Sequence, residues 1–375
     1  MNIAARARYA WDTSSFGPFA RTRFTVDTVR AARTGWHAFD AGPLCLAYGG
    51  YRAGLTHVVP FLRERAEAAG LPLGPLTRWS RRKPPAADLV VIGGSHRAMA
   101  RLPPAHAVVA PFRVHLVLEL GGPAGWRPDS VSRKERQHFR RERDRRGWRL
   151  EITRDAADLA FFLDRMHEPT MSARHGDHAR SVSADVAKHA ILRRGLLFFV
   201  TEGGSRVGGV LCHLDRARGV LTLRLAGVLD AAPAHYRSGL YTALYLLVAE
   251  WAAAQDLARV DLSGCEPFLS KGIFRFKRKL HPRVLVPGNH FAGRVLHLAA
   301  RRDSPELRDL LVANPLIARS PAGLEAVYFH DDERPARTDL RWHGTGLTAA
   351  RPVHLDRFLA GLPTRREAPR CASVS

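Results

Sequence analysis

The sequence lacks the features of a secreted, membrane-spanning or disulfide-built protein. Its four cysteines form no C-x-x-C pair, which argues against a zinc ribbon and a disulfide framework. The stretch up to Trp11 has no apolar core of the signal-peptide kind, and the longest predicted apolar helix is interrupted by Glu250 and too short to cross a bilayer. We therefore expect a protein of the reducing cytoplasm with no membrane span. The cysteines are Cys45, Cys212, Cys265 and Cys371.

Acidic residues are also scarce. The chain has 35 Asp and Glu against 58 Lys and Arg, which leaves a formal net charge of +23. Lysines are few, so nearly all of the excess comes from arginine. A preference for arginine over lysine changes which basic residue is used but not the balance of basic and acidic residues. The shortage of Asp and Glu therefore needs another cause. A polyanionic partner such as tRNA is one such cause, and crowded ribosomal or membrane surfaces are others.

The first 125 residues are predicted to form an α/β domain. With 375 residues, 46% of them hydrophobic, the chain can bury a sizeable core and hold two domains. Residues 24–30 alternate like an edge strand, residues 54–70 have apolar side chains at helical spacing, and strands are expected at 88–94 and 112–120. The turn-rich stretch at 121–125 marks the expected end of domain 1–125.

The middle of the chain, residues 126–290, is predicted to form a second α/β domain. A basic helix ends at Arg146, and a strand at 150–153 and a helix at 156–166 follow it. Two apolar runs joined by Glu202-Gly-Gly-Ser predict an antiparallel hairpin, which a strand at 220–229 extends. A helix from about 238 to 255 leads at once into a strand at 259–262.

Residues 291–375 form a C-terminal extension in this prediction. Short helices are expected at 295–300 and 305–312, a strand at 324–330, and a flexible tail from Thr364. The extension could complete the sheet of the first domain or cover an acceptor site, and the sequence leaves both open.

Two motifs resemble those of a known family. One is Lys134-Glu-Arg-Gln-His-Phe-Arg-Arg, with a glycine just beyond the end of its helix, and the other is Phe274-Arg-Phe-Lys-Arg-Lys-Leu. With the order of elements between them, they cover about residues 126–286. This part resembles the Gcn5-related N-acyltransferase (GNAT) superfamily, and within it the Fem-type (FemAB-like) branch, whose members move amino acids from aminoacyl-tRNA onto cell-wall precursors.

The resemblance implies an α/β fold with a mixed, mostly antiparallel GNAT-like sheet flanked by helices. Fem-type proteins often carry two such halves, and the first domain could be a reduced copy. The implied activity is direct transfer of an acyl or aminoacyl group onto an amine, borne by a small molecule or a cell-wall precursor. It requires no bound cofactor, and acyl-CoA or aminoacyl-tRNA would serve as co-substrate.

The turn before the helix at 238–255 is the expected donor site. In coenzyme-A-dependent members of the superfamily a Q/R-x-x-G-x-G/A motif stands here, and its amides cradle the pyrophosphate. With Gly239 as the first glycine, tyrosines stand at the Q/R position and at the second glycine, which weakens the coenzyme A hypothesis. The alternative is a simple helix start with Ser238 as N-cap. The candidate donor-binding residues are Tyr236, Arg237, Ser238, Gly239, Tyr241 and Arg275.

The candidate catalytic residues are Lys277, Glu266 and Asp261. Lys277 matches the lysine of the family's F-K motif, a position associated with polarising the acyl carbonyl or holding the donor's terminal phosphate. Asp261 and Glu266 follow the strand beside the expected donor site, and either could take the proton or orient the amine. The alternative for Lys277 is an outward position on an edge strand at 274–280. A covalent role for Cys265 is not favoured, because no histidine follows at a recognisable spacing.

The basic helix is the candidate tRNA contact. Arg133, Arg136, Arg140 and Arg143 fall on one stripe at 3.6 residues per turn, and Lys134, Arg141 and Arg145 extend the positive band beside it. A clamp on backbone phosphates is one interpretation, and a solvated helix with internal ion pairs to Glu135 and Glu142 is the other.

Residues 167–178 are predicted to form a loop rich in histidines and carboxylates. Their spacing matches no metal-ligand pattern, so no metal site is expected. By the family resemblance, Arg174 and His175 become candidate acceptor contacts, with a plain surface loop as the alternative.

Three functions therefore remain open. The first is a Fem-like acyltransferase that uses aminoacyl-tRNA, the second an acyl-CoA-dependent N-acetyltransferase acting on a small molecule, and the third a non-catalytic RNA-binding protein.

Overall fold

The computed structural model describes residues 3–14, 17–79, 83–121, 125–175, 182–343 and 346–364, without the side chains of residues 32, 33 and 175. The linker at 122–124, the loop residues from 176 and the tail from 365 lie outside these ranges. The chain divides into two compact units with interleaved segments. The first unit comprises residues 1–13, 115–263 and 276–284, and the second comprises 14–114, 264–275 and 285–375. The sequence-based boundaries after residues 125 and 290 remain predictions.

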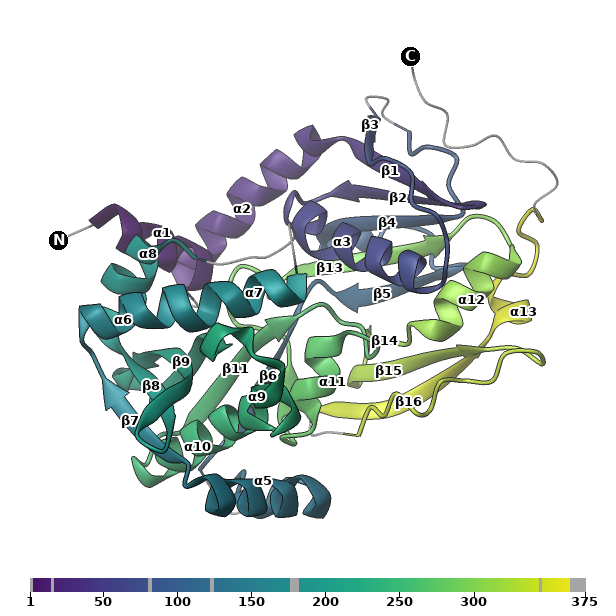
Figure 1. The fold of residues 1–375 in the computed structure, drawn as a ribbon. Helices are drawn as coiled ribbons and strands as arrows, with labels where there is room; N and C mark the ends of the chain where they lie inside the picture. The colour runs from purple at the N-terminus through teal and green to yellow at the C-terminus, as the bar shows by residue number, and fades with distance from the viewer. Residues whose placement is uncertain are drawn as a thin grey trace. The chain divides into compact units, whose positions relative to one another are not determined.

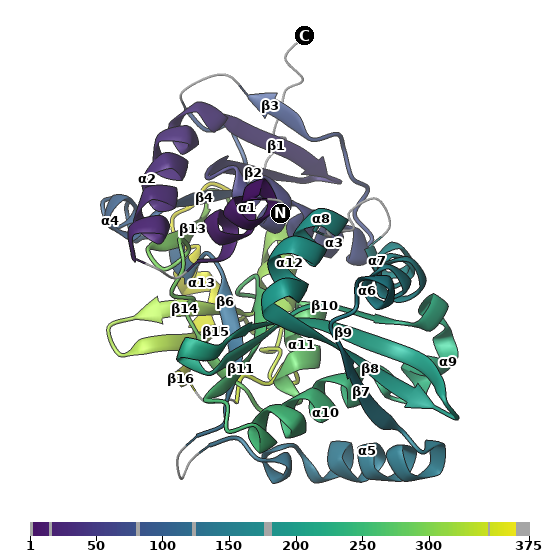
Figure 2. The same cartoon turned by 90° about the vertical axis from the view of Figure 1, so that its left-hand side faces the viewer.

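The first unit contains a seven-stranded sheet in the order β12-β6-β11-β10-β9-β8-β7. Neighbours from β7 to β10 are antiparallel, and β10 and β11 are parallel. Helices α6 and α7 cover one face, and α10 with α5 covers the other (Figures 1 and 2). The strands are β6 (Val114–Glu119), β7 (Arg149–Thr153), β8 (Gly195–Glu202), β9 (Ser205–Asp215), β10 (Val220–Val228), β11 (Arg259–Cys265) and β12 (Arg283–Leu285). The helices are α1 (Ile3–Thr13), α5 (Arg133–Arg146), α6 (Ala156–Phe162), α7 (Glu168–His175), α8 (Ala184–Val186), α9 (Pro233–Arg237), α10 (Leu240–Ala254) and α11 (Gly272–Arg278), the last shared between the units.

The second unit contains a six-stranded mixed sheet, β3-β1-β2-β4-β13-β5, and a three-stranded sheet, β14-β15-β16. Its strands are β1 (Trp36–Ala41), β2 (Leu44–Gly50), β3 (Thr77–Trp79), β4 (Leu89–Ser95), β5 (Ala107–Pro111), β13 (Arg294–Ala300), β14 (Leu316–Ser320), β15 (Gly323–His330) and β16 (Leu347–His354). Its helices are α2 (Gly17–Thr34), α3 (Ala53–Ala68), α4 (His96–Met99), α12 (Pro305–Ala313) and α13 (Leu355–Phe358).

The expected fold class is confirmed, since both main sheets are mixed, mostly antiparallel and flanked by helices. The second unit repeats one feature of the first. In it, β2, α3 and β4 form a strand–helix–strand unit with parallel strands, as β10, α10 and β11 do. The predicted hairpin is also confirmed as β8 and β9, which bury a continuous apolar run.

Three local predictions are wrong. Residues 24–30 lie in α2, where Thr28 bonds back to the carbonyl of Phe24 at 2.8 Å and so satisfies its hydroxyl within the helix. Residues 295–300 form β13, which is buried along its whole length and therefore has no periodicity that separates strand from helix. Residues 168–175 form α7 instead of a loop, since a π-helical turn at 163–167 connects them to α6 and Pro169 stands at a helix start that tolerates it.

The C-terminal extension completes the sheet of the second unit. Strand β13 lies between β4 and β5, antiparallel to both. One of the two alternatives for residues 291–375 is thus confirmed. Helix α12 adds Leu307, Leu310 and Leu311 to the core of this unit, together with α3.

Candidate active site

The parallel strands β10 and β11 separate soon after they begin to pair. Their register covers Val220 to Thr222 on β10 and ends at the Thr222 and Asp261 pair. Next to this point β10 has a bulge between Leu223 and Leu225 in its ladder with β9. Such an opening between parallel strands, beside the start of the connecting helix, is a common ligand site in α/β folds.

Ser263 stands at this opening in a strained conformation. Its φ is +65°, a left-handed value that residues other than glycine seldom adopt. Three hydrogen bonds hold it there: its N–H donates to Asp261 Oδ1 at 2.7 Å, its hydroxyl donates to the Leu223 carbonyl at 2.6 Å, and its carbonyl accepts from Lys277 Nζ at 3.2 Å. Strain that its surroundings enforce in this way is frequent at functional sites.

Lys277 is buried, with only 4% of its surface exposed. Residues 272–278 form helix α11, which carries Lys277. The edge-strand alternative for residues 274–280 is therefore wrong. The Trp126 indole donates to the Leu280 carbonyl at 2.8 Å and ties the chain after α11 to the first unit. The lysine therefore reaches the strand opening from a fixed helix.

Asp261 lies at the same opening. Its carboxylate also accepts from His115 Nδ1 at 2.9 Å. Burial raises the pKa of Asp261, but the charge and hydrogen bond of His115, the Ser263 N–H and the charge of Lys277 outweigh burial and hold the pKa below its usual range. Asp261 is thus ionised at neutral pH and a weak base, better suited to orienting a partner than to taking a proton.

Glu266 belongs to the second unit. Its buried carboxylate lies 3.1 Å from His57 Nδ1 and 3.7 Å from Arg113 Nη1. Burial raises the pKa of Glu266, yet His57, Arg113 and Lys271 lower it overall to well below the usual range. Arg275 is exposed in the second unit. Of the three predicted catalytic residues, the first unit brings together Asp261 and Lys277.

The start of α10 is crowded with side chains. Gly239 is the N-cap in a left-handed conformation at φ +79°, and a Cβ there would lie 2.7 Å from His138 Nε2 of α5. Arg174 lies over the rings of Tyr236 and Tyr241 at 4.5 and 4.3 Å. Tyr241 also contacts Phe276, with ring centroids 5.3 Å apart. Predicted donor and acceptor residues thus form one cluster.

One detail of this turn differs from prediction. Ser238 is not an N-cap: its hydroxyl donates to the His235 carbonyl at 2.9 Å, and Gly239 takes the cap position. Arg237 is exposed, and the side chain of His175 lies outside the described residues. No group of His, Cys, Asp or Glu suited to a metal ion occurs in the ranges that the structure describes.

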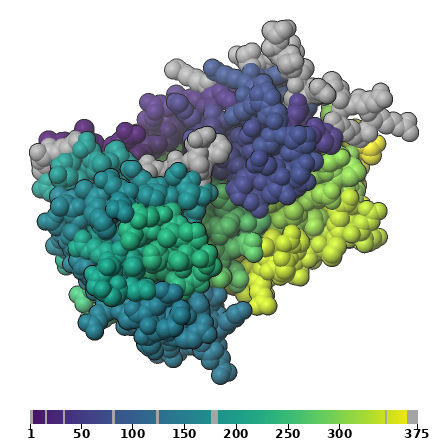
Figure 3. All heavy atoms as spheres, in the orientation of Figure 1, coloured from purple at the N-terminus to yellow at the C-terminus, as the bar shows by residue number. Residues whose placement is uncertain are grey.

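The basic helix α5 forms as predicted. Ser132 caps its start and Gly147 ends it at φ +63°. Figure 3 shows this part of the chain at the surface. The buried Glu142 accepts hydrogen bonds from Arg145 and Arg146 and lies 3.4 Å from Arg141 Nε, while Arg143 pairs with Glu250 at 3.2 Å. The C-terminal half of the helix is therefore largely neutralised.

The N-terminal half keeps its positive charge. Within the described ranges, no ion pair involves Arg133, Lys134, Arg136 or Arg140. Arg136 and Arg140 line a small pocket of about 60 Å³ together with Arg143, Phe139 and Glu250. The two interpretations of this helix each fit one half of it: internal ion pairs towards its end, and an unneutralised band at its start.

Glu142 gives this helix a predicted acid sensitivity. Hydrogen bonding from Arg145, then Arg146, lowers the pKa of Glu142 to about 2 despite its burial. Because the folded pKa lies below the value of about 4.3 usual for glutamate, the stabilisation is present above that value and is lost as the pH falls towards 2. Thermal unfolding followed by circular dichroism between pH 5 and 2 should show a steeper fall of Tm for the wild type than for Glu142→Gln. Parallel curves would contradict this.

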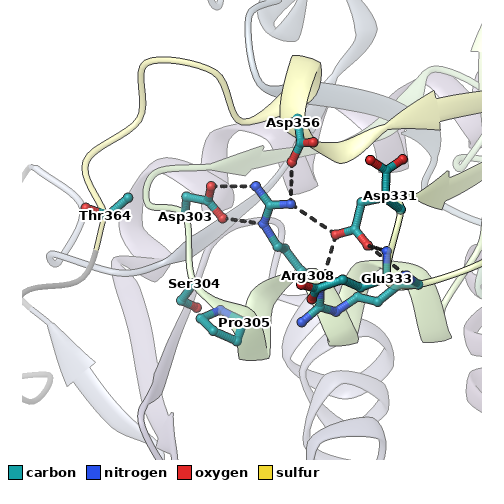
Figure 4. A pocket seen from close by; sticks show the side chains of 10 residues that line it. Asp303, Ser304, Pro305, Arg308, Asp331, Glu333, Asp356 and Thr364 are labelled. Atoms are coloured by element: carbon teal, nitrogen blue, oxygen red, sulfur yellow. Dashed lines mark hydrogen bonds and ion pairs between the residues drawn. The ribbon is translucent and has the colours of Figure 1, made fainter.

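A separate pocket of about 490 Å³ in the second unit is strongly acidic (Figure 4). Figure 4 shows Arg308 between three carboxylates: two bonds of 2.7 Å join it to Asp303, and bonds of 3.0 and 2.6 Å join it to Asp331 and Asp356. Arg334 pairs with Asp331 as well. These ion pairs connect α12 to the ends of β15 and β16, which is a structural role.

Several solved structures are similar to this chain at low identity. L-PGS from Bacillus licheniformis matches at 14% identity and a TM-score of 0.37, over 82% of this chain and 95% of that one. The C-terminal domain (DUF2156) of a putative lysylphosphatidylglycerol synthetase from Agrobacterium fabrum matches at 14% and 0.35, over 70% and 79%. FemX matches at 13% and 0.37, over 73% and 90%. No curated protein matches the chain.

None of the described helices is long and apolar enough to span a membrane. Residues 130–278 match the family model described as the acetyltransferase (GNAT) domain. This match includes β7 to β11, the helices between them and Lys277. Residues 130–278 therefore form an acyltransferase domain of the GNAT superfamily.

Proposed function

We propose that this domain transfers an aminoacyl group from aminoacyl-tRNA to an amine acceptor by direct attack on the ester carbonyl. The observation that carries the proposal is the crowded start of α10. It lies next to the opening between β10 and β11, which Lys277 and Asp261 line. An acyltransferase needs a place for the carbonyl and a place for the donor's anionic part. The strand opening supports a place for the first, and the crowded start of α10 argues against a pyrophosphate there as the second.

The start of α10 offers little room for a pyrophosphate. A coenzyme A pyrophosphate requires close approach to backbone amides, and small residues normally permit it. Here Tyr241 stands at the second of the two small positions, and its ring packs against Phe276 and Arg174. The His138 ring of α5 also lies close to Gly239. These contacts support a donor whose phosphates bind elsewhere.

The unneutralised half of α5 is a suitable place for such phosphates. Four cationic side chains in two helical turns form a band that tracks a nucleic-acid backbone by charge. Arg133, Lys134 and Arg140 are exposed, and Arg136 is half-buried. His138 of the same helix contacts the start of α10, so a backbone bound along α5 would end near the α10 N-terminus. The net charge of +23 adds long-range attraction for RNA.

Lys277 and Asp261 then have separate roles. The Lys277 ammonium, which donates to the Ser263 carbonyl, places its positive charge beside the donor carbonyl and polarises it. Asp261 holds Ser263 and His115 in place through its hydrogen bonds, and its negative charge favours a positive charge beside it. The acceptor would be a small molecule or cell-wall precursor that carries an amine, and the reaction would take place in the cytoplasm without a bound cofactor.

Thermal-shift titration separates this proposal from the acyl-CoA alternative. We expect deacylated tRNA to raise the Tm of the protein. Acetyl-CoA should leave the Tm unchanged even at about 1,000 times the tRNA concentration. At that excess, a ligand whose Kd equals the tRNA concentration would stabilise the folded protein by about 4 kcal/mol. Stabilisation by acetyl-CoA but not by tRNA would favour the N-acetyltransferase. Stabilisation by tRNA, with no transfer from any aminoacyl-tRNA to any amine, would favour a non-catalytic RNA-binding protein.

A further inference from the structure

A row of polar side chains crosses the sheet of the first unit at the strand opening. The register pairs Thr222 with His213 on β9 and with Asp261 on β11, so these three residues share one face. His115 on the adjacent strand β6 continues the row, with its Nδ1 2.9 Å from Asp261 Oδ2. Beside Asp261, therefore, stands an imidazole whose position the sheet fixes.

The pair is partly accessible. The side chains of His115 and Asp261 are 17% and 18% exposed. Asp261 uses Oδ1 for the Ser263 N–H and Oδ2 for His115, so the carboxylate is engaged on both oxygens. An imidazole held at Nδ1 by a carboxylate has that nitrogen protonated and keeps Nε2 as its basic atom.

Polar and charged groups of α11, α1 and β10 lie near the pair or near His213. Lys277 of α11 acts on Asp261 by its charge. The Tyr9 ring of α1 lies 5.3 Å from the His213 ring in a tilted arrangement, and Arg224 of β10 lies 5.2 Å from the Tyr9 ring. The carboxylate at Nδ1 leaves Nε2 of His115 as the ring atom that can accept a proton.

We propose that His115 is the general base of the transfer reaction and that Asp261 is its positioning residue. This inference rests on the proposed function and names the group that the sequence prediction sought in Asp261 or Glu266. The amine nitrogen forms a bond to the carbonyl carbon of the donor, and Nε2 of His115 takes one proton from that nitrogen. The bond between the carbonyl carbon and the ribose oxygen breaks, and the proton passes from His115 to this oxygen. The products are an amide and a deacylated tRNA with a free hydroxyl.

The test compares His115→Gln, Asp261→Asn and His115→Ala with a matched control, His189→Gln, a partly exposed histidine on the turn at 187–191. Each variant is assayed under steady-state conditions with labelled aminoacyl-tRNA and, separately, with labelled acetyl-CoA, against a pool of low-molecular-weight amines. We expect kcat to fall by about 10²- to 10⁴-fold in His115→Gln, the usual contribution of a general base, with the KM for donor unchanged. The acid limb of the pH profile of kcat should disappear. Imidazole in the buffer should restore part of the activity of His115→Ala.

The outcomes distinguish this inference from the function on which it rests. If the wild type transfers and His115→Gln retains its rate and pH profile, the general base is another group while the acyltransferase function stands. If rate is lost without rescue by imidazole and with the melting temperature lowered, His115 has only a structural role, and the inference is again overturned. If the wild type transfers from neither donor, the proposed function fails and the inference fails with it. Asp261→Asn should lower kcat without changing donor affinity, and a change in KM alone would contradict its positioning role.

Discussion

Replacing Lys277 with methionine should lower the rate of acyl transfer by at least about 10³-fold while the protein still binds tRNA. Methionine has a similar length and keeps the packing of α11, but it removes the N–H groups that reach the strand opening. Loss of one donor that stabilises a developing oxyanion costs about 10²- to 10³-fold in kcat, and the ammonium charge adds to this. Single-turnover transfer from labelled aminoacyl-tRNA measures the effect.

Lys279→Met is the matched control, two residues further along. Lys279 is exposed and pairs with Glu135 at 3.0 Å, so its loss should change the rate by less than about 2-fold, as is usual for surface ion pairs. Circular dichroism and Tm show whether Lys277→Met folds. If that variant is unstable, Lys277→Arg provides a second test: it keeps the charge but moves the N–H groups, and it should also be slow. Wild-type rates in folded Lys277→Met would remove the residue from the mechanism.

The double change Arg136→Gln and Arg140→Gln should weaken tRNA binding by about 10- to 100-fold at moderate salt. Among the described residues neither side chain forms an ion pair, although the charge of Arg140 also acts on Glu250, so both cations can meet phosphates. Each lost phosphate contact should lower the slope of log K against log salt by nearly one unit, so the double variant should lose about two units. Filter binding at four or more salt concentrations measures both quantities.

Arg145→Gln with Arg149→Gln provides the same change in charge without removing the proposed contacts. Arg145 pairs with Glu142 at the neutralised end of α5, and Arg149 is exposed at the start of β7. We expect a slope within about half a unit of the wild-type value. If both double variants lose slope equally, RNA is bound by the net charge of the surface and the α5 clamp does not exist.

The regular elements of the acyltransferase domain were predictable because their signals are local. A basic helix with Ser132 before it and Gly147 after it carries its own start and stop signals, and the hairpin at β8 and β9 has a two-glycine turn between apolar runs. The prediction failed where distant contacts decide. Strand β13 is buried between β4 and β5, and α2 gains from its Thr28 contact with Tyr51 at 3.0 Å, neither of which a sequence window reveals.

The candidate site was predictable in part for the same reason. Lys277 and Asp261 were found by motif and by position after a strand. His115 was missed because it is 146 residues away from Asp261 in the sequence, and only the pairing of β6 beside β11 brings the two together. One weak signal existed: His115 occupies a polar position in an alternating strand whose neighbours, Val114 and Leu116, are buried. Glu266 looked equivalent to Asp261, but the chain passes into the second unit between them.

The most direct test of the account is to locate the acyl group of a bound donor. A tRNA acceptor-stem minihelix with an amide-linked 3′ aminoacyl group that bears a diazirine is photolysed on the protein, and the labelled peptides are mapped by mass spectrometry. We predict label on residues 261–263 and on the α11 peptide that contains Lys277, with deacylated tRNA as competitor abolishing it. Labelling confined to other peptides, and insensitive to that competitor, would contradict the placement of acyl transfer at the opening between β10 and β11.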